Sequence, residues 1–210
     1  MRYVQSICVY CGSGKGNNPA YAEAAALLGR MAAEAGIRIV YGGGSVGLMG
    51  TVARSATDAG GKVTGIIPEF LVRREGIISD LDELIVTDDM HTRKRTMFER
   101  SDGFVVLPGG IGTLEETAEI MTWFQLGQHH KPIVLANIEN FWDPLIALID
   151  HMSEDAFIRA GLEVSFGVSP TIEKVFPKLE TMAATFRAAE LEKAHAAAET
   201  EGEAPSLSNL

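Results

Sequence analysis

The stretch FVVLPGGIGTLEET, Phe104–Thr117, joins an apolar run to a helical pattern through a glycine-rich turn. The first turn of a helix has free backbone N–H groups and a partial positive charge, so it attracts anions. Gly109, Gly110 and Gly112 would leave those N–H groups uncovered and allow a phosphate to approach closely. The Thr113 hydroxyl would either cap the helix or bind a phosphate oxygen. This stretch therefore predicts a phosphate-binding loop, with an ordinary strand-to-helix turn as the alternative.

A second glycine-rich turn, YGGGSVGLMG at 41–50, follows the same logic, since Gly42, Gly43 and Gly44 separate an apolar run from a helical pattern. It is not a strict dinucleotide fingerprint, because no acidic residue stands at the position expected for one after the next strand, which ends in Ile66, Ile67 and Pro68. It also has no Gly-Lys-Ser/Thr of a Walker loop. The loop favours a mononucleotide, or a phosphate with its sugar, over NAD.

Apolar runs alternate with helical patterns along the whole chain. We expect strands within 6–10, 37–41, 62–68, 83–87, 103–108, 131–137 and 162–169, and helices within 19–35, 46–61, 90–101, 111–125, 141–152 and 170–198, the last interrupted at Pro177. Residues 69–82 read as a polar loop. This alternation predicts an α/β fold, a Rossmann-like doubly wound parallel sheet with helices on both faces. We expect one nucleotide-binding domain over 1–198 and a disordered tail over 199–210.

Three glycine loops, at 12–16, 42–47 and 109–112, follow expected strands, and ligands of such sheets bind beyond the carboxyl ends of the strands.

Composition narrows the classes of partner. The formal net charge of −10 argues against nucleic-acid binding, which needs a basic surface. No apolar stretch has the length of a membrane span, so we expect no membrane contact and a cytoplasmic location. Cys8 and Cys11 lack the second pair typical of a metal site; a buried strand cysteine and a loop cysteine are favoured over a redox motif. His129 and His130 are interpreted as a helix-end feature, so no metal is expected.

Charged residues flank the glycine loops. Glu115 and Glu116 are placed at the start of the helix, where carboxylates commonly complement the helix dipole. Beside a bound phosphate they would be repelled unless they faced another group, and a ribose ring offers hydroxyls. Arg93, Lys94 and Arg95 cannot all point the same way from one helical turn; a solvated face is the alternative to one or two of them entering the cleft.

Together, YGGGSVGLMG, MHTRK and PGGIGTLEE resemble the LONELY GUY family of nucleoside 5′-monophosphate phosphoribohydrolases. The resemblance implies a Rossmann-like homodimer that needs no cofactor. It also implies hydrolysis of the N-glycosidic bond of an adenosine-type 5′-monophosphate to the free base and ribose 5-phosphate. Arg93 and Glu116 match the family's catalytic pair. The matching substrate-binding positions are Glu75, Lys94, Gly109, Gly110, Ile111, Gly112, Thr113, Leu114, Glu115 and Thr122, to which the second glycine loop adds Gly43 and Gly44.

Three alternative functions can be compared with the same residues. A lysine decarboxylase, a label often attached to this family, needs a lysine that forms a Schiff base with pyridoxal phosphate, and no lysine here has such a setting. A nucleosidase with broad preference for AMP or several monophosphates stays open. So does a carrier of a nucleotide or phosphorylated cofactor without catalysis, although a carrier does not need Arg93 and Glu116.

The apolar residues of the expected helix at 111–125 predict that the chain forms a homodimer. Ile120, Met121, Trp123, Phe124 and Leu126 make it apolar over much of its circumference, whereas a helix on one face of a sheet needs one apolar stripe. A two-fold dimer contact would bury the surplus. Cover by neighbouring helices or by the C-terminal helix is the alternative, and the resemblance favours the dimer.

Overall fold

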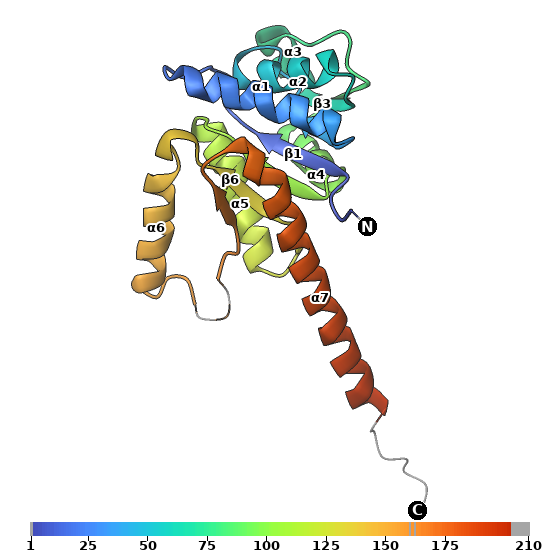
Figure 1. Cartoon of the computed structure of the whole chain (residues 1–210), viewed down its shortest axis with the longest axis vertical. Coiled ribbons are helices and arrows are strands. Elements are labelled where there is room, and N and C mark those ends of the chain that lie inside the picture. Colours follow the sequence, from blue (N-terminus) through green and yellow to red (C-terminus); the bar gives the residue numbers. More distant parts are fainter. Residues whose placement is uncertain (1, 160, 162, 203–210) are drawn as a thin grey trace, which may run out of the picture.

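The computed structural model describes residues 2–159, 161 and 163–202. Its centre is one parallel sheet in the order β4-β3-β2-β1-β5-β6-β7 (Figure 1). The strands are β1 (Ser6–Tyr10), β2 (Arg38–Tyr41), β3 (Val63–Pro68), β4 (Glu83–Thr87), β5 (Gly103–Val106), β6 (Ile133–Ala136) and β7 (Gly167–Ser169). In the middle, Cys8 of β1 pairs with Val40 on one side and Phe104 on the other. The predicted doubly wound α/β fold is confirmed.

Helices connect the strands. They are α1 (Pro19–Glu34), α2 (Gly47–Asp58), α3 (Glu69–Glu75), α4 (Met90–Glu99), α5 (Ile111–Gln125), α6 (Asp143–Glu154) and α7 (Val175–Gly202), with short 3-10 turns η1 (Ile138–Asn140) and η2 (Ile172–Lys174). Local signals explain several ends. The Asn18 side chain accepts a hydrogen bond from Ala20 and caps α1, Pro19 opens it, and Gly36 follows it with a φ of +65°.

Two expectations about elements were wrong. The polar loop at 69–82 contains a helix, α3. Pro177 does not interrupt the last helix, because it is the third residue of α7, where the backbone N–H has no partner within the helix anyway. Helix α7 continues beyond residue 198 through Gly202, and the remainder of the expected tail, 203–210, lies outside the described residues.

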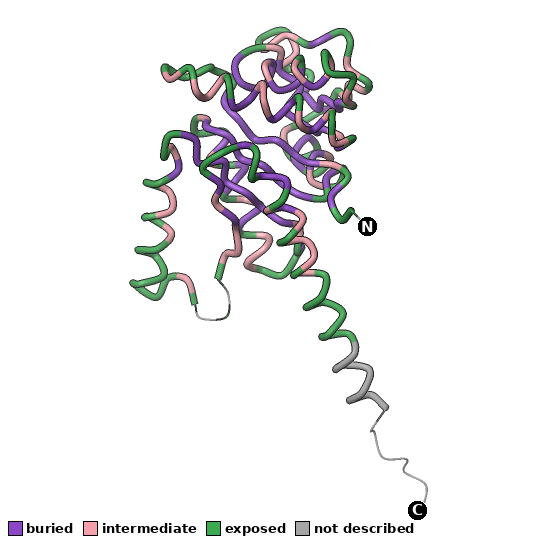
Figure 2. The backbone as a smooth tube through the Cα atoms, in the orientation of Figure 1, coloured by how far each residue is buried: buried purple, intermediate pink, exposed green. Residues whose placement is uncertain are grey.

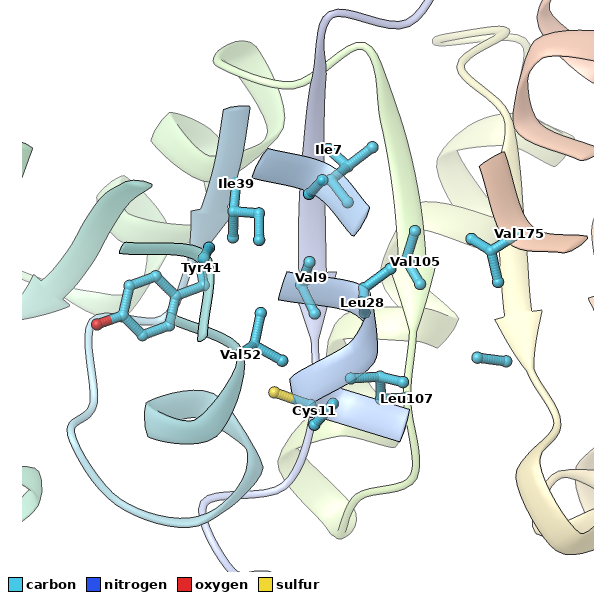
Figure 3. Close-up of a cluster of buried hydrophobic side chains, with 14 of the residues drawn as sticks. Ile7, Val9, Cys11, Leu28, Ile39, Tyr41, Val52, Val105, Leu107 and Val175 are labelled. Carbon is cyan, nitrogen blue, oxygen red and sulfur yellow. The ribbon is translucent and has the colours of Figure 1, made fainter. Parts of the chain in front are cut away.

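The central strands are buried on both faces, so their alternate residues enter two separate cores, whereas the edge strand β4 is partly exposed. Ile7 and Val9 of β1 pack in a cluster with α1, α2 and the start of α7 (Figure 3). Cys8 and Tyr10 pack in the opposite cluster, with α4, α5 and α6. Cys11 belongs to the first cluster, so the two buried, free cysteines serve different cores. The expected buried strand cysteine is confirmed, and the spacing brings no redox pair together.

The strand order reverses at β1, and this reversal positions the candidate site. From β1 the chain builds β2, β3 and β4 to one side and β5, β6 and β7 to the other. The loops after β1 and β5 therefore meet at the carboxyl edge of the sheet, where the Gly12 N–H donates to the Pro108 carbonyl at 3.1 Å. Crevices at such a reversal are the usual ligand sites of doubly wound sheets.

The periphery is more exposed than the sheet (Figure 2). Helix α7 begins against the body and then projects away from it, whereas α6 stands at the margin without a fully buried residue (Figure 1). Within the described ranges, no helix combines the length and the apolar character needed to cross a membrane.

Candidate functional site

Helix α5 occupies the expected range, Ile111–Gln125, but Glu115 and Glu116 do not lie at its start. Its first residue is Ile111 and its N-cap is Gly110, so Glu116 lies in the second turn and the first turn holds no carboxylate. The expectation that Glu115 and Glu116 begin the helix was wrong. Glu116 lies on the face of α5 that contacts Arg93 of α4, and it is only 8% exposed.

Arg93 projects from α4 onto Glu116. The helix starts at a capping carboxylate, Asp89, which accepts from the Thr92 N–H at 2.8 Å. Arg93 is only 6% exposed, and its Nη1 donates to Glu116 Oε1 at 3.0 Å. Its Nε donates to the Ile66 carbonyl at 3.1 Å and its Nη2 to the Gly42 carbonyl at 3.3 Å. The guanidinium is thus bound to two backbone carbonyls at the edge of the sheet and to one carboxylate.

Burial and the nearby cations act in opposite directions on the pKa of Glu116. Burial raises the pKa of this carboxyl above its ordinary value, and the neighbouring Glu115 raises it further. The cations Arg93 and Lys94 partly offset this rise. A buried carboxylate with a raised pKa is a stronger base than a solvated one, and this is the property that a general base requires.

The loop at 42–44 is built to admit Arg93. A Cβ at Gly42 would collide with the Arg93 guanidinium, and Gly43 adopts a φ of +79°, which side chains disfavour. A Cβ at Gly44 would lie 2.9 Å from Glu75 Oε2. Glycine at these positions therefore allows two charged side chains to approach the backbone.

Glu75 ends α3 beside this loop. Its backbone carbonyl accepts from the Ser45 N–H at 3.2 Å and from the Ser45 hydroxyl at 2.9 Å, which fixes the end of the helix. Its Oε2 is buried and has no hydrogen-bond partner among the described residues. Since an unpartnered buried carboxylate oxygen is costly, this atom is suited to accept from a ligand.

Lys94 lies next to Arg93 in sequence but binds different carboxylates. Its Nζ is 2.6 Å from Glu115 Oε1 and 3.0 Å from Glu119 Oε1. Arg95, the third cation of the turn, is exposed. The sequence analysis did not predict a role for Glu119. The available signal was its position four residues after Glu115, which places both carboxylates on the same face of the helix.

The first turn of α5 faces open space. A Cβ at Gly110 or Gly112 would meet no described atom within 4 Å. Thr113 is not the cap, because it is the third helical residue and its side chain fills the space behind Gly109. The loop after β1 closes a cavity of about 280 Å³ against Gly109 and Gly110, and brings Ser13 and Lys15 to it. Neither Ser13 nor Lys15 was predicted.

Some predicted site residues lie elsewhere on α5. The Thr122 hydroxyl donates to the Ala118 carbonyl at 2.7 Å, and Thr122 and Leu114 line an apolar cavity of about 430 Å³ between α5 and α6. Ile111 is largely exposed. The structure therefore gathers Gly42–Gly44, Glu75, Arg93 and Glu116 but leaves these three residues on the outer side of the helix.

His129 lies just beyond the end of α5. Its Nε2 is 2.9 Å from the Ile120 carbonyl, and its Nδ1 accepts from the Lys131 N–H at 3.1 Å. The ring is therefore the neutral tautomer with Nε2 protonated, in accord with a pKa that burial lowers. His130 pairs instead with Glu190 of α7, so the adjacent histidines diverge as expected.

Known proteins share this sequence and fold. A family described as "Possible lysine decarboxylase" matches residues 49–179. Cytokinin riboside 5′-monophosphate phosphoribohydrolase LOG of Oryza sativa is 44% identical over 174 residues, covering 83% of this chain and 72% of that protein. The corresponding enzyme LOG3 of Arabidopsis thaliana is 43% identical over 177 residues, covering 84% and 82%.

Solved structures give the fold. The molybdenum cofactor binding protein of Rippkaea orientalis has a TM-score of 0.61 at 25% identity and covers 84% of this chain and 96% of that one. The Moco carrier protein of Chlamydomonas reinhardtii has a TM-score of 0.62 at 24% identity, with coverage of 86% and 98%. The motifs, the Arg93–Glu116 pair and the extent of the sequence match agree, and the chain belongs to the LONELY GUY family of cytokinin riboside 5′-monophosphate phosphoribohydrolases.

Proposed function

We propose that this chain hydrolyses the N-glycosidic bond of adenosine-type nucleoside 5′-monophosphates, either N6-substituted AMP such as isopentenyladenosine monophosphate or AMP itself. The products are the free base and ribose 5-phosphate. The observation that carries the proposal is the buried pair of Arg93 and Glu116, 3.0 Å apart, next to a glycine loop that opens a helix.

Glu116 has the main catalytic role. Cleavage of an N-glycosidic bond develops positive charge on the ribose ring, and a carboxylate near the ring stabilises that charge. The same carboxylate orients the attacking water and accepts its proton, for which the raised pKa of Glu116 is suited. Its buried position strengthens both effects, because little water competes for the charge.

Arg93 supports this role without transferring a proton. A guanidinium is a poor proton donor, so Arg93 does not protonate the departing base, which takes its proton from water. Arg93 holds Glu116 in place and counters negative charge in the site. Since Ile66 and Gly42 already bind the guanidinium, this positive charge needs little rearrangement during the reaction.

The remaining groups suit a monophosphate. The free N–H groups of the first turn of α5 face a phosphate near Gly110, and Lys15 adds a positive charge at the same cavity. The unpartnered Oε2 of Glu75 accepts from a hydroxyl of the ribose or an N–H of the base. The phosphate and the nucleoside part of the substrate thereby each have a recognition group.

Decarboxylation of lysine does not fit this site. A Schiff base with pyridoxal phosphate needs a neutral lysine amine. Burial alone would lower the pKa of Lys94, but its hydrogen bonds to Glu115 and Glu119 outweigh burial and raise it. The lysine beside the catalytic pair is therefore held in the protonated form, which is not nucleophilic.

The carrier alternative is favoured only by the fold shared with molybdenum cofactor carriers. A carrier binds without chemistry, and it does not need a buried Arg–Glu pair whose desolvation is costly.

Assay of ribose 5-phosphate release from AMP and from N6-isopentenyl-AMP tests the proposal. The chain should turn over at least one of them, and Glu116→Gln should lower kcat by about 10²–10³-fold. Binding of AMP, measured by calorimetry, should change by less than about threefold, because the lost interaction belongs to the transition state. Glu34→Gln, an exposed position on α1, is the control. Tight binding of AMP without product would favour a carrier, whereas full turnover by Glu116→Gln would remove Glu116 from the catalytic role.

We also propose a homodimer formed through α5 and α6. Part of the apolar surplus of α5 is covered within the chain, since Trp123 packs on Phe98 and Phe124 on Phe186 of α7. Large apolar side chains nevertheless stay exposed. Leu148 at 48% and Phe157 at 82% line the cavity between α5 and α6, and Ile111 at 80% and Leu126 at 65% lie at the two ends of α5. A patch of this kind marks an interface. A cytoplasmic location stays a prediction.

A further inference from the structure

Two adjacent cations of α4 bind three carboxylates of α5. Arg93 binds Glu116, and Lys94 binds both Glu115 and Glu119. Neighbouring residues of a helix point about 100° apart. The two cations therefore contact α5 at separate points, and together they fix its position along and around its own axis.

The surroundings of Lys94 are those of an internal contact. Two carboxylates occupy its Nζ, and its side chain is only 10% exposed. Glu115 and Glu119 are four residues apart on one helix, where like charges repel each other. Lys94 lies between them and removes that repulsion. To reach a phosphate, the ammonium would have to give up a carboxylate partner.

We propose that Lys94 is a positioning residue rather than a phosphate ligand: with Glu119 as its second partner, it holds α5 against α4 so that Glu116 meets Arg93. This inference rests on the proposed hydrolase function. It assigns a role to Glu119, which lies outside the glycine loop. It also predicts that Lys94 acts on turnover through Glu116, whereas a phosphate ligand would act on substrate affinity.

The titratable and charged groups that act on Glu116 or feel its charge come from three parts of the chain: Arg93 and Lys94 from α4, Glu115 from α5, and Cys8, Tyr10 and Cys11 from β1 and the loop after it. Burial raises the pKa of both thiols and of the phenol, so they stay neutral at working pH. The charges that control the titration of Glu116 are therefore Arg93, Lys94 and Glu115. Removing the positive charge of Lys94 raises the pKa of Glu116, and removing the negative charge of Glu115 lowers it.

Kinetics of three variants on AMP test the positioning role. Lys94→Met should lower kcat by about tenfold or more, because a misplaced catalytic group is costly, with KM within about threefold of the original. The acidic limb of its pH–rate profile should move to higher pH. Lys94→Arg should recover part of kcat. Glu119→Gln should lower kcat by about two- to fivefold, as expected for a partly exposed ion pair, with KM unchanged.

A second measurement does not depend on activity. In protein labelled with ¹³C at the glutamate carboxyls, the Glu116 signal is assigned from its loss in Glu116→Gln and followed through a pH titration. Its pKa should be higher in Lys94→Met and lower in Glu115→Gln than in the unaltered chain. These opposite shifts test the inference even if the chain hydrolyses no monophosphate. A Glu116 titration that is the same in all variants would overturn it, as would a Lys94→Met variant with raised KM and retained kcat.

Discussion

Gly42 is where the smallest change should have a large effect on the site. Its carbonyl accepts from Arg93 Nη2 at 3.3 Å, and a Cβ there would collide with the same guanidinium and lie 3.1 Å from Met49 Sδ. Gly42→Ala should therefore displace Arg93 and lower kcat by up to about 10²-fold, the scale of a 1 Å misplacement. Steady-state kinetics check this, with circular dichroism to verify folding. A folded Gly42→Ala protein with unchanged kcat would mean that Arg93 moves without consequence.

Residue identities were only partly predictable. The motifs pointed to Arg93 and Glu116, and the structure brings them within hydrogen-bond distance. Glu119 was missed because its partner Lys94 is 25 positions away in sequence, and only folding brings the two helices together. Of the two roles considered for Thr113, capping the helix was wrong, because the N-cap is Gly110, three residues earlier.

At the scale of elements, the N-terminus of α5 allows a clean test of phosphate binding. Gly110 has an extended backbone, with a φ of −95° and a ψ of −157°, and its missing side chain would point into open space. Gly110→Val should therefore fold normally but occupy the space of the phosphate. Calorimetry should show weaker binding of AMP and unchanged binding of adenosine. If adenosine binds the original chain as well as AMP does, the loop is only a structural turn.

His129, just beyond the end of α5, should make the free energy of unfolding depend on pH. Burial lowers the pKa of His129 in the folded chain, so the unfolded chain takes up the proton first as pH falls. The contribution is fully present above the ordinary histidine pKa of about 6.5 and is lost as pH falls from there through the lowered folded value.

Thermal unfolding from pH 8 to pH 5 measures this effect. His129→Gln should reduce the dependence of Tm on pH, whereas His151→Gln, at an exposed position of α6, should retain it. Equal slopes in both variants would assign the effect to other groups.

Most elements could be predicted because their ends carry local signals, such as Asn18 with Pro19 and the glycine after α1. Helix α3 could not, since it has no buried residue and no side-chain cap. What fixes its end is a contact with Ser45, which is 30 positions earlier in the sequence. Tertiary contacts of this kind leave no periodic pattern to read.

At the scale of the whole molecule, activity should depend on assembly. If α5 and α6 pair two copies, the helix that carries Glu116 is supported by the interface. Light scattering should show a dimer, and Phe157→Glu should yield a monomer with reduced kcat, because a buried unpaired charge is costly. Leu191→Glu, at an exposed position of α7, is the matched control and should remain dimeric. A fully active monomer at micromolar concentration would contradict the prediction.

The backbone carbonyls of Ile66 and Gly42, which bind Arg93, also affect how well the site tolerates substitutions. Every amino acid has a backbone carbonyl, so substitution of Ile66 changes packing but does not remove the acceptor for Nε. At Gly42 the carbonyl is equally independent of the side chain, and a substitution there acts through the size of the new side chain. The orientation of Arg93 therefore does not depend on the identity of most side chains around it. Substitutions in the walls of the site can therefore leave the geometry of the charged centre unchanged.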